Sequence, residues 1–344
     1  MSQSDINTTT MRAWRFGRPG QLEHTLTLDA NVPKPAASSL KPQELLVKVS
    51  ECGLNPADYK LNEMGQVARV VLAYPKTAGM DFGGVVAAVG SQVDDIKVGS
   101  SVLGRASPLE SPGGLSEYVV VDRSVVAEYA PRIRDPAGLP TAGLTAYQTI
   151  APYVSAGSKI FINSGSGGVG TMCVQIGKIL GCHVTTTCST GKMDLCKELG
   201  ADVVIDYKTS SVVEKLQGAG LKFDLIVDNV GNNPSNLFSA SNDYLKPHAP
   251  YFFVGGNLSF STVTSLLYAT LAPAFMGGAK GSFRVFMTKN SQPDLEQLTA
   301  WLSDGKLKLI VDKRFSFEEA KSAMEYVKKD SPRGKVIVNV GANQ

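Results

Sequence analysis

Short apolar runs separated by glycine and proline characterise the first third of the chain. Runs of about four to eight apolar and β-branched residues between such turn formers favour β-strands. Strands are expected at Leu45–Val49, Val85–Val89, Ser101–Leu103 and Glu117–Val121. The region from about Met11 to Val126 is therefore predicted to be rich in β-structure.

The pattern changes near Ala137, where apolar runs begin to alternate with stretches of helical periodicity. This alternation is typical of βαβ units, because parallel strands need a crossover that is usually a helix. Helices are expected at Val169–Leu180 and Lys192–Leu199. The expected strands are Lys159–Ile162, Val184–Thr187, Val203–Ile205, Leu225–Val227, Tyr251–Val254 and Phe283–Met287. Six such strands predict an α/β fold with a doubly wound parallel sheet of the dinucleotide-binding kind.

The chain after about Ser291 has too few elements for a domain of its own. Two helices, Leu295–Leu302 and Phe317–Lys328, precede a last strand at Lys335–Val340. We expect this tail to rejoin the β-rich part. The predicted domains are residues 1–131 with 291–344, and residues 132–290.

Composition narrows the class of protein. The 344 residues suffice for two domains, and 43% hydrophobic with 19% charged residues is typical of a globular chain. The net charge of +3 is scattered along the chain, which disfavours a nucleic-acid-binding protein. The five cysteines form no C-x-x-C pair and are expected to be reduced thiols.

Two segments bear on localisation. Met1–Thr10 lacks the apolar core of a secretory signal. The stretch from Pro247 to Ala279 has no Asp, Glu, Lys or Arg, but prolines and polar residues interrupt it. No run of about 18 apolar residues remains, so no membrane span is expected. We expect a cytoplasmic protein.

The most informative segment is a glycine-rich turn between an expected strand and an expected helix. Gly165, Gly167 and Gly170 form a G-x-G-x-x-G pattern, with Gly168 and Val169 between them. Glycines allow a tight turn and close approach of a pyrophosphate, and the helix that follows offers free N–H groups and a positive dipole end. A lone pattern of this kind is also compatible with a simple turn, but the βαβ setting favours a nucleotide site.

The end of the second expected strand distinguishes the two nicotinamide cofactors. An NAD site carries Asp or Glu there for the ribose 2′-hydroxyl. This chain has instead Ser189, Thr190 and Lys192, whose hydroxyls and positive charge suit the 2′-phosphate of NADPH. The alternative is that Ser189 caps a helix and Lys192 is solvated.

Eight segments together resemble the quinone oxidoreductase branch of the medium-chain dehydrogenase/reductase superfamily. They are Gly53–Lys60, Gly79–Val86, Thr141–Tyr147, Ser164–Gly170, Gly200–Asp202, Ile205–Tyr207, Asp228–Gly231 and Arg333–Val336. The resemblance implies a GroES-like β-rich catalytic domain around a Rossmann nucleotide-binding domain, with NADPH in the cleft and a possible homodimer.

The same resemblance implies a set of cofactor contacts. Gly168 and Val169 would meet the pyrophosphate, while Ser189, Lys192 and Tyr207 would surround the 2′-phosphate. The ribose and nicotinamide would be lined by Val230, Phe253, Val254 and Gly255, with Thr145 and the loop Asn55–Lys60 facing the nicotinamide and Lys335 closing over the cofactor. Alternatively, Tyr207 is a surface aromatic, Thr145 a helix residue and Lys335 a solvated strand end.

No metal is expected. The zinc enzymes of this superfamily have a cysteine where this chain has Asn55 and a histidine where it has Met80. The three histidines, His24, His183 and His248, show no paired spacing.

Without a Lewis acid, the easiest acceptors are already activated, such as a quinone or an α,β-unsaturated carbonyl compound. Asn55 is expected to donate to the acceptor oxygen, and Tyr59 or Lys60 to relay a proton. The alternatives are a surface pair between Asp58 and Lys60, Tyr59 packed in the wall, and protonation from solvent.

The substrate stays open at this point. The apolar segment Leu258–Met276 suits either a pocket for a small hydrophobic enone, enoyl or quinone substrate, or a dimer interface. A biosynthetic enoyl reductase, a redox-neutral cyclase and a non-catalytic NADPH sensor are the alternative functions.

Overall fold

The computed structural model describes residues 9–110, 112–231, 233–255 and 279–341. The chain forms two compact units. The first unit comprises residues 1–144 and 290–344, and the second unit comprises residues 145–289. The segment Leu258–Met276 lies outside the described residues.

The first unit is built on two sheets. The larger sheet is antiparallel except where β15 and β16 pair, and β7 (Tyr118–Asp122) joins it through β3. Its strand order is β15 (Val311–Ser316), β16 (Lys335–Asn339), β3 (Glu44–Leu54), β5 (Asp81–Val89), β6 (Ser101–Arg105) and β8 (Val126–Glu128). The smaller sheet has the order β2 (Leu26–Pro33), β1 (Thr10–Phe16) and β4 (Lys76–Thr77).

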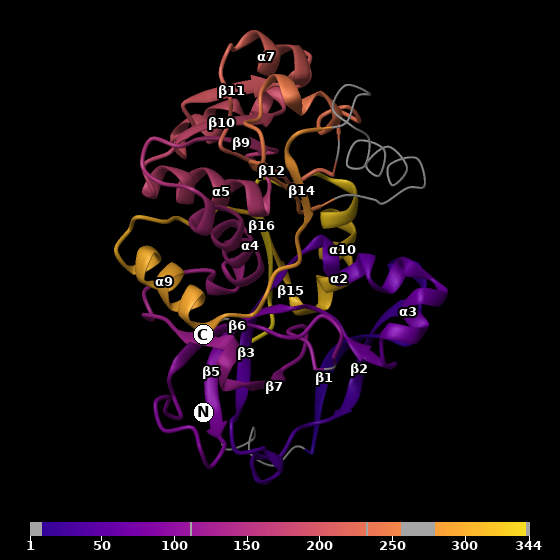
Figure 1. Ribbon diagram of the computed structural model, residues 1–344. Helices are drawn as coiled ribbons and strands as arrows, with labels where there is room; N and C mark the ends of the chain where they lie inside the picture. The colour runs from indigo at the N-terminus through magenta and orange to yellow at the C-terminus, as the bar shows by residue number, and fades with distance from the viewer. Residues whose placement is uncertain (1–8, 111, 232, 256–278, 342–344) are drawn as a thin grey trace. The chain divides into compact units, whose positions relative to one another are not determined.

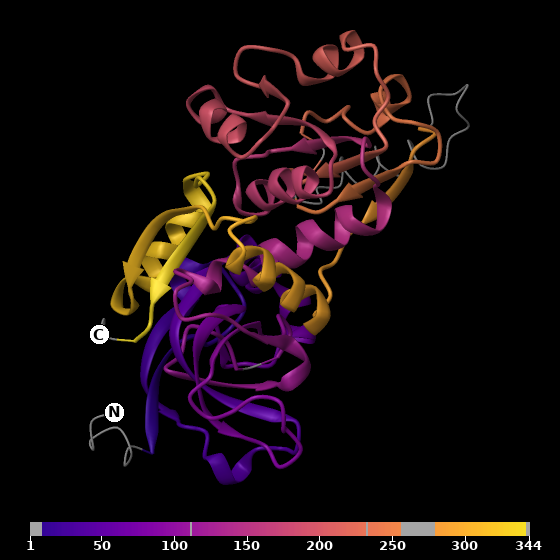
Figure 2. The same ribbon diagram turned by 90° about the vertical axis from the view of Figure 1, so that its left-hand side faces the viewer.

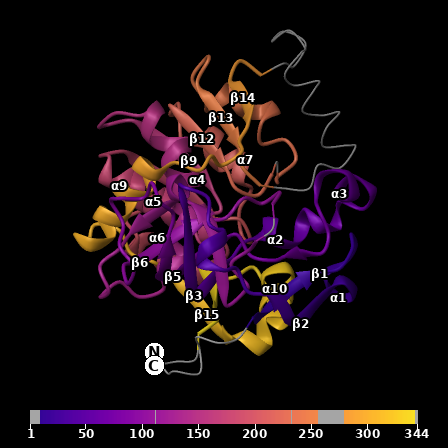
Figure 3. The ribbon, with the colours of Figure 1, turned by 90° about the horizontal axis from the view of Figure 1, so that it is seen from below.

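The C-terminal tail is part of this first unit. Strand β16 runs antiparallel to β3, with Val338 opposite Cys52, and Figure 2 shows β15 and β16 in yellow beside the indigo strands. Helix α10 (Ala320–Lys329) packs near α1 (Leu22–Thr25), as Figure 3 shows from below. The Trp14 indole donates a 2.7 Å hydrogen bond to the Phe317 carbonyl. The two ends of the chain therefore share one hydrophobic core.

The second unit contains a six-stranded, fully parallel sheet (Figure 1). Its order is β11 (Val203–Asp206), β10 (His183–Cys188), β9 (Lys159–Asn163), β12 (Leu225–Asp228), β13 (Pro250–Phe253) and β14 (Ser282–Val285). From β9 the chain adds β10 and β11 on one side of the sheet, and then β12, β13 and β14 on the other side, so the topological switch point lies between β9 and β12. In such sheets ligands bind at the carboxyl ends of the strands at this switch point.

The apolar composition of the central strands explains their position. Ile160, Phe161 and Ile162 of β9 are fully buried, as expected for a parallel strand covered on both faces. Helix α5 (Gly168–Ile179) packs closely here, because a Cβ on Gly177 would lie 2.7 Å from Ile160 Cδ1. Helices α6 (Met193–Glu198) and α7 (Val212–Gly218) follow β10 and β11. The predicted α/β fold class, β-rich domain plus Rossmann-type sheet, is confirmed.

The remaining helices include α2 (Pro56–Lys60), α3 (Gln66–Val71), α4 (Pro140–Ile150) and α9 (Gln292–Ser303). All five cysteines are buried free thiols. Among the described residues, no helix combines the length and apolar character that a membrane span requires.

Candidate functional site

The three motif glycines of the second unit meet different steric demands. A Cβ on Gly165 would lie 2.2 Å from Thr186 Oγ1, and one on Gly170 would lie 1.9 Å from the Ser164 carbonyl. Both positions therefore need glycine for the packing of the protein itself. At Gly167 the nearest atom would be Ser164 Oγ at 3.6 Å, an ordinary contact. The packing of the protein therefore does not require glycine at position 167, which is where the motif lets a pyrophosphate approach the backbone.

Hydrogen bonds to the neighbouring strand β10 hold the glycine turn in place. Ser164 adopts a φ of 69°, in the left-handed region that non-glycine residues rarely occupy. Its N–H donates to Thr187 Oγ1 at 2.8 Å, and the Gly165 N–H donates to the Thr187 carbonyl at 2.8 Å. Thr187 Oγ1 in turn donates to Asn163 Oδ1 at 2.7 Å. These contacts offset the backbone strain and hold the turn open.

Helix α5 begins in this turn without a side-chain cap. Its N-cap residue is Gly167, which makes no side-chain hydrogen bond. Helical geometry leaves the first N–H groups, here on Gly168, Val169 and Gly170, without an intrahelical acceptor. Such groups, at the positive end of the helix dipole, bind phosphate. The residues present therefore fit a dinucleotide pyrophosphate.

A buried carboxylate organises the ends of β12 and β13. Asp228 is fully buried and accepts hydrogen bonds from Asn163 Nδ2 at 2.9 Å and the Tyr251 hydroxyl at 2.8 Å. It also accepts from the N–H groups of Val230 and Gly231, both at 3.1 Å. The loop that carries Val230 is thereby fixed against the switch point.

The other predicted ribose and nicotinamide contacts adjoin this loop. The Val254 N–H donates to the Asp228 carbonyl at 2.9 Å, and a Cβ on Gly255 would lie 2.7 Å from the Asn229 carbonyl. The side chain of Phe253 points into the hydrophobic core, so only its backbone is available to a ligand. Thr145 is also buried, and its hydroxyl shares a 2.6 Å hydrogen bond with Thr288.

The residues predicted for the 2′-phosphate come together at the ends of β10 and β11. Cys188 and Asp206 are paired in register, and the Tyr207 N–H donates to the Cys188 carbonyl at 3.2 Å. Ser189 begins the short 3₁₀-helix Thr190–Lys192 without a capping bond from its side chain. Thr190 instead bonds Asp206 at 2.6 Å.

Tyr207 is 48% exposed, with the Lys208 ammonium 5.4 Å from its ring centroid. The strand ends therefore present a hydroxyl, a partly exposed lysine and an aromatic face in one region of the second unit.

A buried ion pair lies in the first unit. Lys335 Nζ is 3.2 Å from Asp81 Oδ2, and the two side chains are 3% and 0% exposed. Asn55 bridges them, because its amide donates to Asp81 at 2.9 Å and its oxygen accepts from Lys335 at 2.7 Å. Thr141 donates to Asp81 Oδ1 from its N–H at 3.1 Å and from its hydroxyl at 2.5 Å. Lys335 is thus not the solvated strand end considered from the sequence.

The three predicted catalytic residues differ in their surroundings. Asn55 already bonds Lys335 and Asp81. Tyr59 belongs to the hydrophobic core, with the Lys328 ammonium 5.9 Å from its ring centroid. Lys60 is partly buried, and the loss of hydration lowers its pKa.

The sequence also suggested a surface pair between Asp58 and Lys60, which is wrong. Asp58 is buried, and its two oxygens accept the N–H groups of Asn55 at 2.7 Å and Met80 at 2.9 Å. The polar residues near Asp58 in the sequence do not indicate that its side chain is buried. The three-residue spacing from the N-cap residue Asn55 to Asp58 was the available signal, because it matches a capping box.

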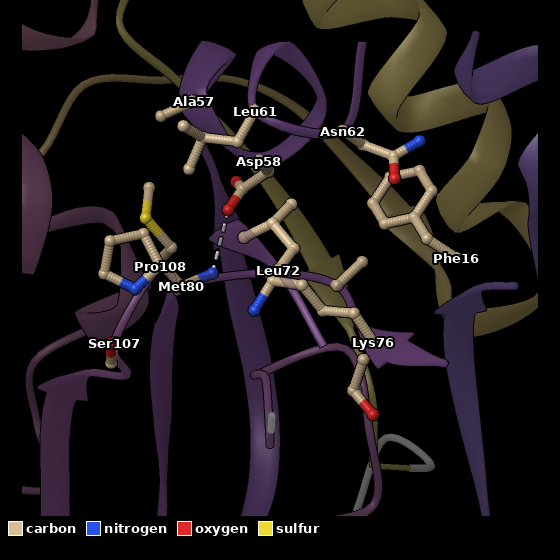
Figure 4. A pocket seen from close by; sticks show the side chains of 13 residues that line it. Phe16, Ala57, Asp58, Leu61, Asn62, Leu72, Lys76, Met80, Ser107 and Pro108 are labelled. Atoms are coloured by element: carbon tan, nitrogen blue, oxygen red, sulfur yellow. Dashed lines mark hydrogen bonds between the residues drawn. The ribbon is translucent and has the colours of Figure 1, made fainter. Parts of the chain in front are cut away.

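A pocket opens beside Asp58 (Figure 4). It is small, with a cavity volume of about 10 Å³, which is room for about one water molecule, and it is partly open to solvent. Its wall is about equally apolar and polar: Leu61, Leu72 and Met80 lie around the Asp58 carboxylate, and Asn62 and Lys76 also line it. Burial is the main cause that raises the pKa of Asp58 to about 7, and the nearby charge of Asp81 adds to it.

Within the described ranges, no group of three His, Cys, Asp or Glu side chains is arranged to bind a metal ion. At the two positions where the zinc enzymes carry ligands, the Asn55 amide bonds the ion pair and the Met80 sulfur lies 3.9 Å from Arg105 Nη2.

Comparisons with known proteins agree with this architecture. Residues 41–131 match the family described as alcohol dehydrogenase GroES-like domain, and residues 199–338 match the family described as zinc-binding dehydrogenase. A solved quinone oxidoreductase from Coxiella burnetii superposes with a TM-score of 0.82 at 27% identity, covering 96% of this chain and 99% of that one.

Two relatives are similar in sequence to this chain along nearly its whole length. The trans-enoyl reductase pgmF of Aspergillus terreus is 38% identical, over 96% of this chain and 97% of its own length. The chloroplastic NADPH-dependent alkenal/one oxidoreductase of Arabidopsis thaliana is 32% identical, over 95% and 79%. The chain belongs to the medium-chain dehydrogenase/reductase superfamily, whose oxidoreductases use nicotinamide cofactors.

Replacing Lys335 by methionine is expected to lower the free energy of unfolding by about 3–5 kcal/mol, because Asp81 would stay buried without its cation. Chemical denaturation measures this change. The double variant Lys335→Met/Asp81→Asn should recover part of the loss. Equal stability of Lys335→Met and the wild type would contradict a buried, mutually dependent pair.

Gly170→Ala is expected to weaken nicotinamide dinucleotide binding by roughly tenfold or more, about 1.4 kcal/mol, because the new Cβ displaces the Ser164 carbonyl. Fluorescence titration of the cofactor measures the Kd. Gly218→Ala is the matched control, since a Cβ there meets no atom within 4 Å. The same Kd in both variants would show that the turn does not shape the cofactor site.

Proposed function

We propose that the protein is an NADPH-dependent reductase that acts on a carbon–carbon double bond conjugated to a carbonyl group, with quinones as the second acceptor class. The observation that carries this proposal is the uncapped N-terminus of α5 at the switch point of the sheet, where Gly167 as N-cap residue is not required by the packing of the protein itself. This combination is a cradle for a dinucleotide pyrophosphate.

The choice of NADPH rests on the ends of β10 and β11. Strand β10 ends in Cys188 and is followed by Ser189, so the position that binds the ribose 2′-hydroxyl in NAD sites holds no carboxylate. Ser189, Lys192 and Tyr207 would hold the 2′-phosphate through a hydroxyl, a charge and an aromatic contact. Val230 and the backbone of Phe253, Val254 and Gly255 would contact the ribose and nicotinamide.

The acceptor class is supported by the relatives. The name of the Aspergillus terreus relative describes an enoyl reductase, and that of the Arabidopsis thaliana relative describes an NADPH-dependent alkenal/one oxidoreductase. Both names describe reduction of activated double bonds.

Bound NADPH supplies the hydride. The protein has to orient the acceptor and stabilise the negative charge that develops on its oxygen. Among the sequence-predicted residues, Lys60 suits that charge best, because its ammonium is partly desolvated and forms no ion pair within the described part of the chain. Asn55 is fixed by Lys335 and Asp81 and would present a rigid polar edge. We assign Tyr59 a packing role, since it lies in the core.

The direct test is oxidation of NADPH with a panel of acceptors: 9,10-phenanthrenequinone, 1,4-benzoquinone, a 2-alkenal and a hydrophobic enone. NADH and EDTA serve as controls. Turnover of the enone or alkenal with NADPH, unaffected by EDTA, is the expected result. Tight NADPH binding without turnover of any acceptor would contradict the proposal.

Lys192→Ala is expected to weaken NADPH binding by about 1.5–3 kcal/mol, roughly 10- to 100-fold, because a charged hydrogen bond to phosphate is lost. NADH affinity should not change. Lys197→Ala removes the same charge from an exposed site on α6 and is the control. An equal loss for both cofactors would argue against a 2′-phosphate contact.

A further inference from the structure

Two cysteine side chains are in contact beside the residues proposed for the 2′-phosphate. Cys188 is the last residue of β10, and Cys196 lies on α6. The Cys196 thiol donates a hydrogen bond to the Cys188 sulfur, and both side chains are buried. In the described part of the chain, no other cysteine has a thiol as its hydrogen-bond partner; these are Cys52, Cys173 and Cys182.

The short stretch between the two cysteines carries the proposed phosphate contacts. Ser189 follows Cys188 directly, and the Lys192 N–H donates to the Ser189 carbonyl at 2.9 Å. Lys192 is in turn the N-cap residue of α6, the helix of Cys196. The two thiols therefore lie at the two ends of one tight loop, and a change in their separation has to move the loop.

The environment makes the two sulfur atoms unequal. The hydrogen bond from Cys196 is the main cause that lowers the pKa of Cys188, and the charges of Lys192 and Lys197 add to it, against burial and the charge of Asp206. The same hydrogen bond raises the pKa of Cys196. Because the thiolate is the reactive form, Cys188 suits the attacking sulfur and Cys196 the thiol that resolves it.

The pair lies only one layer below the surface of the second unit. On α6, the neighbours Asp194, Lys197 and Glu198 are exposed, and so is Thr190 in the loop. A helix as short as α6 has little stability of its own, and short surface elements open locally at low free-energy cost. Such opening admits a molecule as small as a hydroperoxide.

We propose that Cys188 and Cys196 form a reversible disulfide, with a hydroperoxide as the oxidant, and that this disulfide weakens the binding of NADPH. The Cys188 sulfur attacks one peroxide oxygen and the O–O bond breaks. The departing oxygen takes the thiol proton and leaves as water or an alcohol. The Cys196 sulfur then displaces the hydroxyl group from Cys188, which leaves as water with the Cys196 proton. The two thiols lose two electrons and the hydroperoxide gains them.

The effect on the cofactor follows from the bond length. A disulfide holds its sulfur atoms about 2.05 Å apart, closer than a hydrogen bond between them does. The end of β10 and α6 are thus drawn together, which shifts Ser189 and Lys192. This part of the inference rests on the proposed function, whereas the disulfide itself does not. Because linkage is reciprocal, bound NADPH should slow the oxidation of the pair.

Peptide mapping of the wild-type protein tests the disulfide. After treatment with hydrogen peroxide and alkylation of the free thiols, mass spectrometry should find one disulfide, between Cys188 and Cys196. Dithiothreitol should remove it, and NADPH added before the peroxide should slow its formation. Thiols at 188 and 196 that stay free, or that pair only with other cysteines, would overturn the proposal.

Two variants separate the roles of the sulfur atoms. In Cys196→Ala the reaction should stop at the Cys188 sulfenic acid, which dimedone traps. Cys182→Ala is the matched control, because it removes a buried cysteine that has no thiol partner in the described residues, and it should form the disulfide as the wild type does. Loss of the disulfide in Cys182→Ala would contradict the assigned pair.

Fluorescence titration tests the effect on the cofactor. The Kd for NADPH should rise about fivefold or more in the oxidised protein and return with dithiothreitol, while the Kd for NADH should change less. A disulfide that leaves the Kd for NADPH unchanged would overturn the link to the cofactor. A reduced protein that binds no NADPH would overturn the proposed function instead, and the peptide map would still decide whether the disulfide forms.

Discussion

The ion pair between Asp81 and Lys335 joins parts of the first unit that lie 254 residues apart in the chain. Both charges are removed from water, so neither is tolerated without the other. Asn55 and Thr141 complete the hydrogen bonding of Asp81, which ties β5, β16, the start of α2 and the start of α4 to one carboxylate. The C-terminal strand and the loop that carries Asn55 and Asp58 are therefore positioned together.

In the second unit, too, a buried carboxylate holds several chain segments together. Asp228 is fully buried, and its hydrogen bonds fix the loop of Val230 beside the glycine turn. Thr187 and Asn163 hold the turn from the adjacent strands. Buried polar groups that are fully hydrogen-bonded specify a single arrangement of the backbone. A pyrophosphate site built from backbone N–H groups needs such rigidity, because it offers no flexible side chains that could adjust to the ligand.

The sequence predicted the parallel sheet well, because buried parallel strands are continuous apolar runs and the glycine turn marks the first crossover. It did not predict β1, β2 or β15. In β2 only Leu26 and Val32 are buried, so the apolar signal is weak. The burial of Lys335 depends on Asn55 and Asp81, which are distant in the chain, so local patterning does not reveal it. The convergence of Ser189 and Tyr207 follows from the register of β10 and β11, which the order of the motifs only suggested.

Isotopic labelling of the cofactor shows whether hydride passes from NADPH to a carbon atom of the acceptor. NADPH deuterated at nicotinamide C4, on each face in turn, is incubated with the protein and a hydrophobic enone, and the product is examined by NMR. We expect one deuterium at the β-carbon for each NADPH oxidised, from one of the two labelled faces. Product without deuterium from either face, or product formed without consumption of NADPH, would contradict it.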